Sequence, residues 1–294
     1  GRDRWGPNAP VGYVIVASMQ VLRGYGEAER VFRDRGELPD AAAREAVLEI
    51  LENVRRRGDA AVRDYTRRFD GARLAALRVP EDAFGAAEKA VAKDVRDAIA
   101  LSTGRVRAFY RHQPHGGFEW RTGGGTLGQL VRPLSRVGVY VPGGSAPLFS
   151  TLLMCAVPAQ VAGVPEIAVV TPPRADGSVA PEILVTAKLL GLTEVYRVGG
   201  AQAVGALAYG TETLRRVDKI VGPGNRFVVL AKQLVFGAVG IEALPGPTET
   251  LVLADETADA RFVAADLLAQ AEHVYAQPVL VTTDEALLER VQQE

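Results

Sequence analysis

Apolar residues recur at helical intervals in the first third of the chain, which predicts amphipathic helices there. Across residues 40–69 the apolar stripe is formed by Val47, Leu51 and Val54, spaced at i, i+4 and i+7. Gly58 interrupts this run, so the pattern predicts either two helices or one kinked helix.

A second helical stretch follows Pro80, with an apolar stripe formed by Val91, Val95 and Ile99. Gly104 is the expected end of this helix, because glycine is a poor helix former. Both stretches are charged on their other face. Together they predict an α-rich N-terminal layer that carries no obvious chemistry.

Short apolar, β-rich runs alternate with helical patterns from about Val131 onward. Parallel strands need a crossover connection, so strands separated by helix-length segments are typical of βαβ units. The pattern therefore predicts an α/β fold with a parallel sheet. The expected strands and the helices that follow them are 137–141 with 148–161, 167–171 with 181–190, 195–198 with 201–209, 219–221 with 225–235, and 251–254 with 258–273, then a strand at 279–281.

The last residues, 284–294, form an amphipathic helical pattern with Leu287, Leu288 and Val291 on one face. No strand follows to receive this crossover, and the chain starts with Gly1 rather than Met. We therefore expect this chain to be a segment of a longer protein, without that protein's C-terminal part.

Composition excludes several classes of protein. The 34 basic and 35 acidic residues give a formal net charge of −1, which lacks the basic excess of a nucleic-acid-binding protein. Hydrophobic residues make up 48% of the chain, yet no apolar run reaches the roughly 20 residues of a membrane helix. Neither a nucleic acid nor a membrane is an expected partner.

Cysteine usage favours the cytoplasm, because the single cysteine, Cys155, excludes a disulfide within these residues. Residues 11–18 are apolar and follow Arg2 and Arg4, which faintly resembles a signal peptide. The apolar run is short, so export is the less favoured alternative.

Open α/β sheets bind ligands beyond the carboxyl ends of their strands. Four glycine-rich junctions stand out along the predicted βα series: residues 140–145, 199–202, 222–225 and 245–249. Glycine lets the backbone approach a ligand, and the following helix start offers N–H groups to an anion. Tyr140, Gln202 and Asn225 each add a polar side chain.

A single such loop is more often an ordinary turn with a capping residue. Four of them along one βα series favour a nucleotide or substrate crevice. None of the four junctions has the G-x-G-x-x-G dinucleotide pattern or the phosphate-binding pattern that ends in Lys-Ser or Lys-Thr.

One helix carries a candidate pair of metal ligands. Gln270 and His273 are spaced i, i+3 in the predicted helix 258–273, so they share a face and can contact one ion. From the residues alone, a surface or capping histidine is the favoured interpretation, since glutamine is an uncommon zinc ligand.

Other reactive residues are interpreted as structural. His112 and His115 have the same spacing, but Pro114 disrupts the helix that would align their rings, which predicts a solvated helix end. Cys155 lies in an apolar helical segment, where a buried thiol has a raised pKa and is inert.

Taken together, the motifs resemble the histidinol dehydrogenase family from about residue 27 to the end. Each motif is weak alone, and the combination is highly specific. The motifs are Arg57-Gly-Asp59, Tyr65-Thr66, Arg68-Phe-Asp-Gly71, Pro133-Leu-Ser-Arg-Val-Gly-Val-Tyr-Val-Pro-Gly-Gly144, Gly199-Gly-Ala-Gln-Ala203, Val217-Asp-Lys-Ile-Val-Gly-Pro-Gly-Asn225, Gly246-Pro-Thr-Glu249 and Asp266-Leu-Leu-Ala-Gln-Ala-Glu-His273.

The resemblance implies a zinc-dependent, NAD-linked oxidation of L-histidinol to L-histidine through a held aldehyde, the last step of histidine biosynthesis. Positions that match the family's NAD contacts are Tyr140, Gln202 and Asn225. Thr248 matches a substrate-binding position. Gln270 and His273 match two metal ligands that also adjoin the substrate, which makes the metal interpretation of this pair the favoured one.

The family's fold implies two incomplete Rossmann-like parallel-sheet domains in an intertwined homodimer with a shared active site. The second, NAD-binding domain would span residues 139–249, and the first would combine residues 1–138 with 250–294. The family's catalytic Glu-His pair and its remaining Asp and His zinc ligands match nothing in this chain, so we expect no general acid or base here. Residues 274–278 also replace the family's usual Gly-Pro-Asp turn.

Two alternatives remain open. One is a family paralogue that oxidises another amino alcohol or a sulfonated diol, with its differences concentrated near Thr248 and residues 274–278. The other is a non-catalytic NAD-binding module, which would bind the dinucleotide without turnover.

Overall fold

The computed structural model describes residues 20–32, 41–113, 116–143, 148–244, 249–271 and 277–294. The chain divides into two compact units, one of residues 39–244 and a smaller one that combines residues 1–38 with 245–294. Each unit has its own hydrophobic core.

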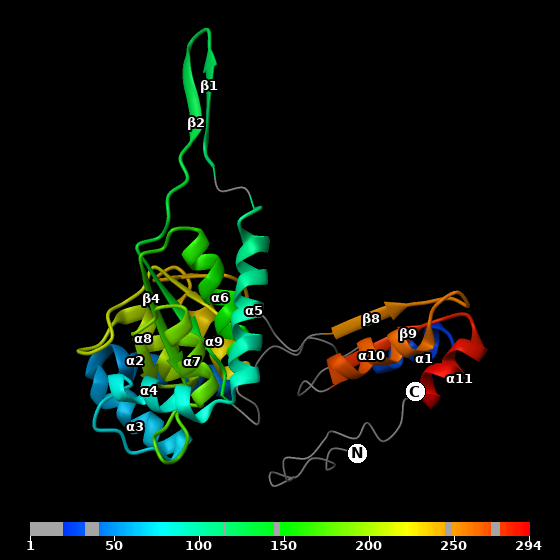
Figure 1. The fold of residues 1–294 in the computed structure, drawn as a ribbon, viewed down its shortest axis with the longest axis horizontal. Helices are drawn as coiled ribbons and strands as arrows, with labels where there is room; N and C mark the ends of the chain where they lie inside the picture. Colours follow the sequence, from blue (N-terminus) through cyan, green and yellow to red (C-terminus); the bar gives the residue numbers. More distant parts are fainter. Residues whose placement is uncertain (1–19, 33–40, 114–115, 144–147, 245–248, 272–276) are drawn as a thin grey trace. The chain divides into compact units, whose positions relative to one another are not determined.

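A five-stranded parallel sheet forms the centre of the larger unit, with strand order β5-β4-β3-β6-β7 (Figure 1). The strands are β3 (Arg136–Tyr140), β4 (Glu166–Thr171), β5 (Val195–Arg197), β6 (Lys219–Val221) and β7 (Gly240–Ile241). The helices between them are α6 (Phe149–Val161), α7 (Pro181–Leu189), α8 (Gly200–Tyr209) and α9 (Arg226–Val235). This alternation confirms the predicted α/β fold. The order of the strands reverses beside β3, which creates the switch point where such sheets bind ligands.

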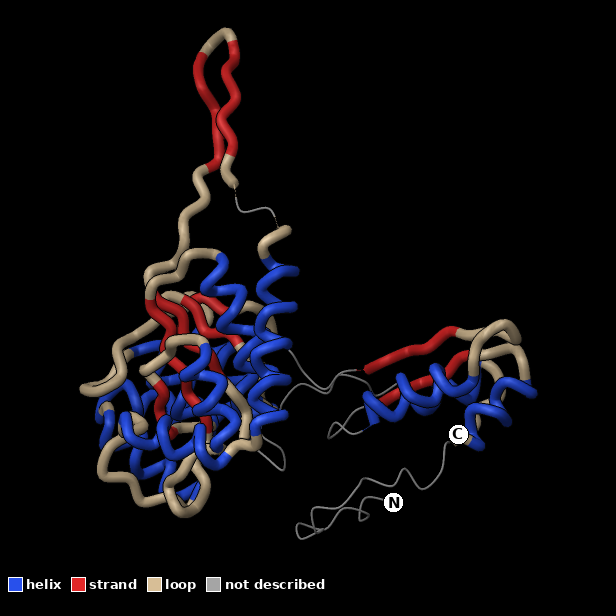
Figure 2. The backbone as a smooth tube through the Cα atoms, viewed as in Figure 1, coloured by secondary structure: helices blue, strands red, loops and turns tan. Residues whose placement is uncertain are grey.

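Helices cover both faces of this sheet (Figure 2). Four further helices precede it in the chain: α2 (Ala41–Arg57), α3 (Asp59–Asp70), α4 (Glu81–Ala90) and α5 (Lys93–Tyr110). One face is covered by α2, α3, α8 and α9, and the other by α4, α5, α6 and α7. Alternate strand residues supply the two cores: Val170 faces the first group of helices and Val169 the second.

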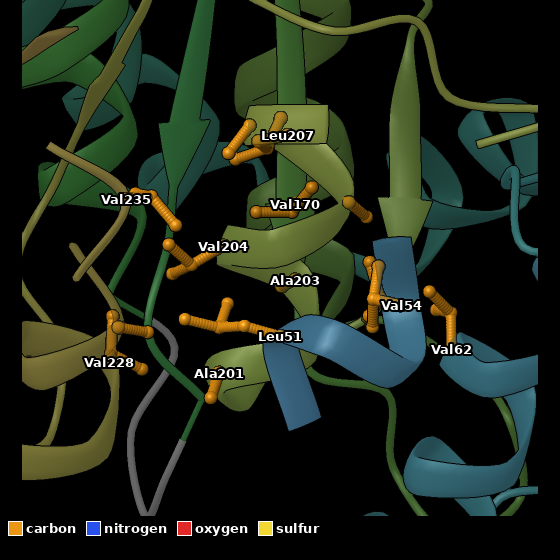
Figure 3. Packing of buried hydrophobic residues seen from close by; sticks show 14 of the residues in the cluster. Leu51, Val54, Val62, Val170, Ala201, Ala203, Val204, Leu207, Val228 and Val235 are labelled. Atoms are coloured by element: carbon orange, nitrogen blue, oxygen red, sulfur yellow. The ribbon is translucent and has the colours of Figure 1, made fainter. Parts of the chain in front are cut away.

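The core between α2 and α8 shows why the N-terminal helices belong to this unit. Leu51 and Val54 of α2 are buried among Ala203, Val204 and Leu207 of α8 (Figure 3). Burying one such aliphatic side chain contributes about 1.5–3 kcal/mol. The predicted division joined residues 1–138 to 250–294. The structure differs, because the apolar stripes of α2 to α5 pack against helices of the larger unit.

The N-terminal helices also differ in where they end. Gly58 separates α2 from α3, as one of the two predicted alternatives has it. Gly104 does not end a helix, because α5 continues to Tyr110. Ile99 and Thr103 of α5 are buried, and this packing outweighs the roughly 1 kcal/mol that an exposed glycine costs. No helix within the described ranges has the length and apolarity to cross a membrane.

A β-hairpin that the sequence pattern did not predict follows α5. Strands β1 (Phe118–Thr122) and β2 (Gly125–Gln129) pair antiparallel and extend away from the central sheet (Figure 1). Every residue of both strands is exposed. Phe118 and Trp120 alternate with Glu119 and Arg121 in β1, a short strand pattern that was not assigned from the sequence.

The smaller unit holds a parallel pair of strands joined by one helix. Strands β8 (Glu249–Leu253) and β9 (Gln277–Val281) flank α10 (Ala260–Ala271), and α11 (Glu285–Gln293) and α1 (Tyr25–Phe32) complete the described elements of the unit. Its core forms between α10 and α11, from residues such as Val263, Leu267 and Leu287. Leu251 and Leu253 of β8 are exposed, so this strand presents an uncovered apolar face.

Candidate functional site

A cavity of about 860 Å³ opens in the larger unit at the carboxyl ends of β3 and β4 and the amino ends of α8 and α9. Tyr140, Gln202 and Asn225, the three predicted cofactor contacts, all line it. They come from three separate glycine-rich junctions, which the parallel sheet brings to one edge. The fourth junction, residues 245–249, lies outside the described residues except for its last position.

Tyr140 ends β3 and is only 3% exposed. Burial raises the pKa of its phenol to about 12, and the negative charge of Asp70 adds to this shift, while a hydrogen bond from Gly200 opposes it. The Gly200 N–H donates to the Tyr140 Oη over 3.0 Å. The phenol is therefore neutral at physiological pH. It positions the first turn of α8 and keeps its own O–H for donation.

Gln202 lies in the first turn of α8 and is fully buried. Within the described part of the chain, neither its Oε1 nor its Nε2 has a hydrogen-bond partner. A buried polar group without a partner costs about 1–3 kcal/mol, so such a group calls for an explanation. Gly200 has φ +62°, and a Cβ there would lie 2.6 Å from Gln202 Oε1. The glycine keeps space open beside the amide.

The two polar atoms of the Asn225 amide have different roles. Its Oδ1 accepts hydrogen bonds from the backbone N–H groups of Phe227 and Val228, over 3.0 and 3.1 Å, and so caps α9. The ordinary capping interpretation therefore holds for this oxygen. The Nδ2 donors take no part in the cap, and they are the atoms that Asn225 can offer to a ligand in the cavity.

An ion pair of the fully buried Lys232 with Glu242, which sequence reasoning missed, fixes the junction before Asn225. Lys232 Nζ donates to Glu242 Oε2 over 2.6 Å and to the Gly222 carbonyl over 3.1 Å, and the Gly222 N–H donates to Glu242 Oε1 over 2.8 Å. The pair thus hydrogen-bonds both the N–H and the carbonyl group of Gly222. Gly222 has φ +117°, and a Cβ there would lie 2.1 Å from the Tyr140 carbonyl oxygen, so only glycine fits.

Asp70 is a second residue at the cavity that the sequence did not single out. It ends α3, lines the cavity, and has no hydrogen-bond partner for its buried Oδ2 among the described residues. Burial raises the pKa of its carboxyl to about 6. It belongs to the family motif of residues 68–71, but that motif was given no role, because its helix lies outside the βα series.

Charged side chains also gather at the amino ends of the strands, where they pair with one another. Arg136 is 5% exposed and contacts Glu166 over 2.8 Å as well as Glu194. Hydrogen bonds from Arg136 are the first cause that holds the pKa of both carboxyls below the ordinary value. Because these groups satisfy each other, we assign this edge a structural role.

Cys155 behaves as the sequence predicts. It packs against the core on the α6 side of the sheet, and burial raises the pKa of its thiol to about 12. The thiol stays protonated at physiological pH, which agrees with an inert, structural cysteine.

The predicted metal and substrate residues are only partly described. Thr248 and His273 lie outside the described residues, as does His115. Gln270 is in the last turns of α10, where the Thr250 hydroxyl donates to its Oε1 over 2.8 Å and holds the amide beside the start of β8. The described residues contain no cluster of three His, Cys, Asp or Glu side chains. An amide oxygen in this place fits a supplementary metal ligand, with the stronger ligands left to other residues.

The sheet and its cavity define a doubly wound α/β protein with a nucleotide-sized site at the switch point. The model of the histidinol dehydrogenase family matches residues 33–294. The chain is 62% identical over 250 residues to the histidinol dehydrogenase of Deinococcus radiodurans, which covers 85% of this chain and 57% of that protein. The enzyme of Thermus thermophilus is 52% identical over 91% of this chain and 64% of its own length.

A crystal structure of histidinol dehydrogenase from Elizabethkingia anophelis is similar with a TM-score of 0.85 and 40% identity, over 90% of this chain and 62% of that one. The chain therefore belongs to the histidinol dehydrogenase family. It spans about 55–64% of the length of the curated relatives that it matches.

Proposed function

We propose that this chain forms the NAD-binding part of a histidinol dehydrogenase, which oxidises L-histidinol to L-histidine through histidinal. The proposal rests on the family membership and on one observation above all. The fully buried Gln202 amide, unpaired among the described residues, lines a cavity large enough for a nucleotide.

The residues of the cavity bind and orient the dinucleotide. The Gln202 amide offers both a donor and an acceptor, the Tyr140 hydroxyl a donor, and Asn225 its Nδ2 donors. Bound NAD would supply the hydride acceptor for both oxidation steps. The ion pair of Lys232 with Glu242 holds Gly222 and thereby fixes the backbone next to Asn225.

Zinc and substrate belong to the smaller unit in this proposal. Gln270 and His273 would contribute two ligands to a zinc ion that orients the nitrogens of L-histidinol, and Thr248 would contact the substrate. The bond from Thr250 to Gln270 supports this assignment, because it fixes the amide oxygen on the side of α10 that faces the start of β8. The acid–base residues of the reaction are not assigned to this chain.

We further infer a cytoplasmic homodimer. Leu251, Leu253 and Phe262 of the smaller unit are 65%, 78% and 72% exposed. A second copy of the protein that covers apolar residues of this kind would form a stable dimer, because the association removes apolar surface from water. The single cysteine suits a reducing compartment. Sedimentation equilibrium tests the dimer, and a monomer at all concentrations would contradict it.

Calorimetric titration of NAD into the chain and into Gln202→Leu tests the cofactor site. The leucine fills a similar volume without polar atoms, so the variant should fold at least as stably and should bind NAD about tenfold more weakly. Gln233→Leu, an exposed position of α9, is the matched control and should bind NAD as the wild type does.

A wild-type chain that does not bind NAD would contradict the proposed cofactor site. The catalytic part is tested by NADH formation from L-histidinol in the protein that carries this sequence, with zinc present. A strong preference for an alcohol without an imidazole ring would favour a paralogue instead.

A further inference from the structure

Asp70 is the acidic side chain most closely held at the cavity. Two acidic residues line it: Glu49, which is exposed, and Asp70, which is half-buried at the end of α3. The Oδ2 atom of Asp70 is buried and has no hydrogen-bond partner in the part of the chain that the structure describes. An unpaired buried carboxylate oxygen is costly to the folded chain, so a donor on a bound ligand would satisfy a group that the described residues leave unpaired.

The position of Asp70 relative to the sheet identifies which part of a dinucleotide it can meet. Gly71, the next residue, adopts φ +72°, and a Cβ there would lie 3.8 Å from the Cβ of Ala175. Ala175 belongs to the loop that follows β4. Asp70 is thus held beside the carboxyl end of the strand next to the central strand β3.

In doubly wound nucleotide-binding folds, an acidic residue near the end of this second strand hydrogen-bonds the ribose of the adenosine half. The residues that follow β4 here and line the cavity are Pro172, Pro173 and Arg174, none of which is acidic. Asp176 also lies in this loop, but it is exposed, accepts a hydrogen bond from the Ser178 N–H and does not line the cavity. The loop after β4 therefore offers no carboxylate to the cavity. Asp70 supplies one from α3 instead.

We propose that Asp70 accepts hydrogen bonds from the hydroxyls of the adenosine ribose of NAD and excludes the dinucleotide that carries a 2′-phosphate. This inference rests on the proposed binding of NAD. A carboxylate only accepts hydrogen bonds, so it suits a ribose diol, and its charge repels a phosphate at the same place.

Arg174 makes the proposal sharper, because it lines the same cavity on the loop that adjoins Gly71. In folds of this class an arginine near the ribose accommodates a 2′-phosphate. The charge of Asp70 therefore decides the selectivity. Without it, the Arg174 guanidinium is placed to bind the phosphate.

The test measures the affinities of NAD and NADP for the full chain by calorimetry. We expect the wild type to prefer NAD by about tenfold or more. Asp70→Asn should bind NAD about tenfold more weakly and NADP more tightly, so that the preference is lost. Adding Arg174→Gln to this variant should remove the gain for NADP.

Asp64→Asn is the matched control, because Asp64 lies on the same helix in an exposed pair with Arg57 and does not line the cavity. It should keep the wild-type preference. Asp70→Ser, which is also uncharged, should repeat the result of Asp70→Asn.

The outcomes separate this inference from the proposed function. If the wild type binds NAD and both Asp70 variants retain its preference over NADP, the role of Asp70 is refuted while NAD binding stands. If the wild type binds neither dinucleotide, the proposed cofactor site fails, and this inference fails with it.

Discussion

At the scale of single residues, burial raises the pKa of the Asp70 carboxyl from its ordinary value of 3.8 to about 6. Between these two values the folded chain holds a proton that the unfolded chain has already released. A group that binds more protons in the folded state makes the free energy of unfolding fall as pH rises. Asp70 therefore destabilises the folded chain at neutral pH, and its full cost is present above pH 6.

Replacement of Asp70 by asparagine should therefore stabilise the chain in the absence of ligand. We expect a gain of roughly 1 kcal/mol at pH 7, after allowance for a carboxyl that is only half-buried. The gain should shrink as pH falls through about 6 toward 4, because the wild-type carboxyl becomes neutral. Urea unfolding at several pH values measures it. A loss of stability at neutral pH would contradict the prediction, and Asp64→Asn should show no such gain.

Sequence reasoning reached some of the residues at the cavity and missed others for a physical reason. Tyr140, Gln202 and Asn225 follow predicted strands at glycine-rich turns, and a parallel sheet must bring such turns to one edge. Asp70 belongs to the family motif of residues 68–71, but the motif itself assigns it no role, and Lys232, which does not line the cavity, carries no local motif. Asp70 comes from a helix outside the βα series, and Lys232 is identified only by its complete burial against Glu242.

At the scale of elements, the junction between β6 and α9 depends on a pair of charges behind it. Replacement of Lys232 by methionine removes the partner of Glu242 and of the Gly222 carbonyl at the same time. The Glu242 carboxylate left behind is partly exposed and stays hydrated, but the charged hydrogen bonds to Glu242 and to the Gly222 carbonyl are lost, so we expect a loss of about 2 kcal/mol in urea unfolding.

The control for this variant is Lys188→Met. Lys188 pairs with Glu88 over 2.6 Å, but both side chains are about half exposed, so its removal should cost less than about 1 kcal/mol. Similar losses of unfolding free energy in the two variants would show that the Gly222 junction does not depend on the pair of Lys232 with Glu242.

The sequence predicted whole elements unevenly, according to how much each one is buried. Strands β3 to β6 and helices α6 to α9 of the larger unit are marked by apolar runs and were predicted to within a few residues, whereas the two-residue strand β7 was not predicted. The hairpin of β1 and β2 has no buried face, and the short alternation of Phe118 and Trp120 with polar residues was not predicted as a strand. The continuation of α5 through Gly104 depends on packing against α6, which local propensity does not contain.

At the scale of the whole molecule, the two units have separate cores, and the periodicity of the sequence did not assign α2 to α5 to either sheet. An amphipathic helix shows that it has an apolar face, but its pattern does not name the surface that covers it. The contacts of α2 with α8 and α9, which include those of Leu51 and Val54, place α2 in the larger unit. The order of the helices along the sequence therefore does not show which unit each helix belongs to.

The division into units predicts where bound NAD changes hydrogen exchange. Every residue found to line the cavity lies between positions 46 and 227 of the larger unit. Ligand at 100 times its Kd stabilises the state that binds it by about 2.7 kcal/mol. Amides of β3, β6 and α8 that exchange through unfolding of this unit should therefore slow by about 100-fold.

Amides of α10 and α11 should keep their rates on addition of NAD, because their core is formed within the smaller unit. The Gln202→Leu variant at the same concentration of NAD is the control, and protection of its larger unit should be about tenfold weaker than in the wild type. Equal protection of α10 and β3 would show that the two units unfold together. Binding of NAD at the cavity would then also slow hydrogen exchange in the smaller unit, which holds the predicted zinc and substrate residues, before any substrate is bound.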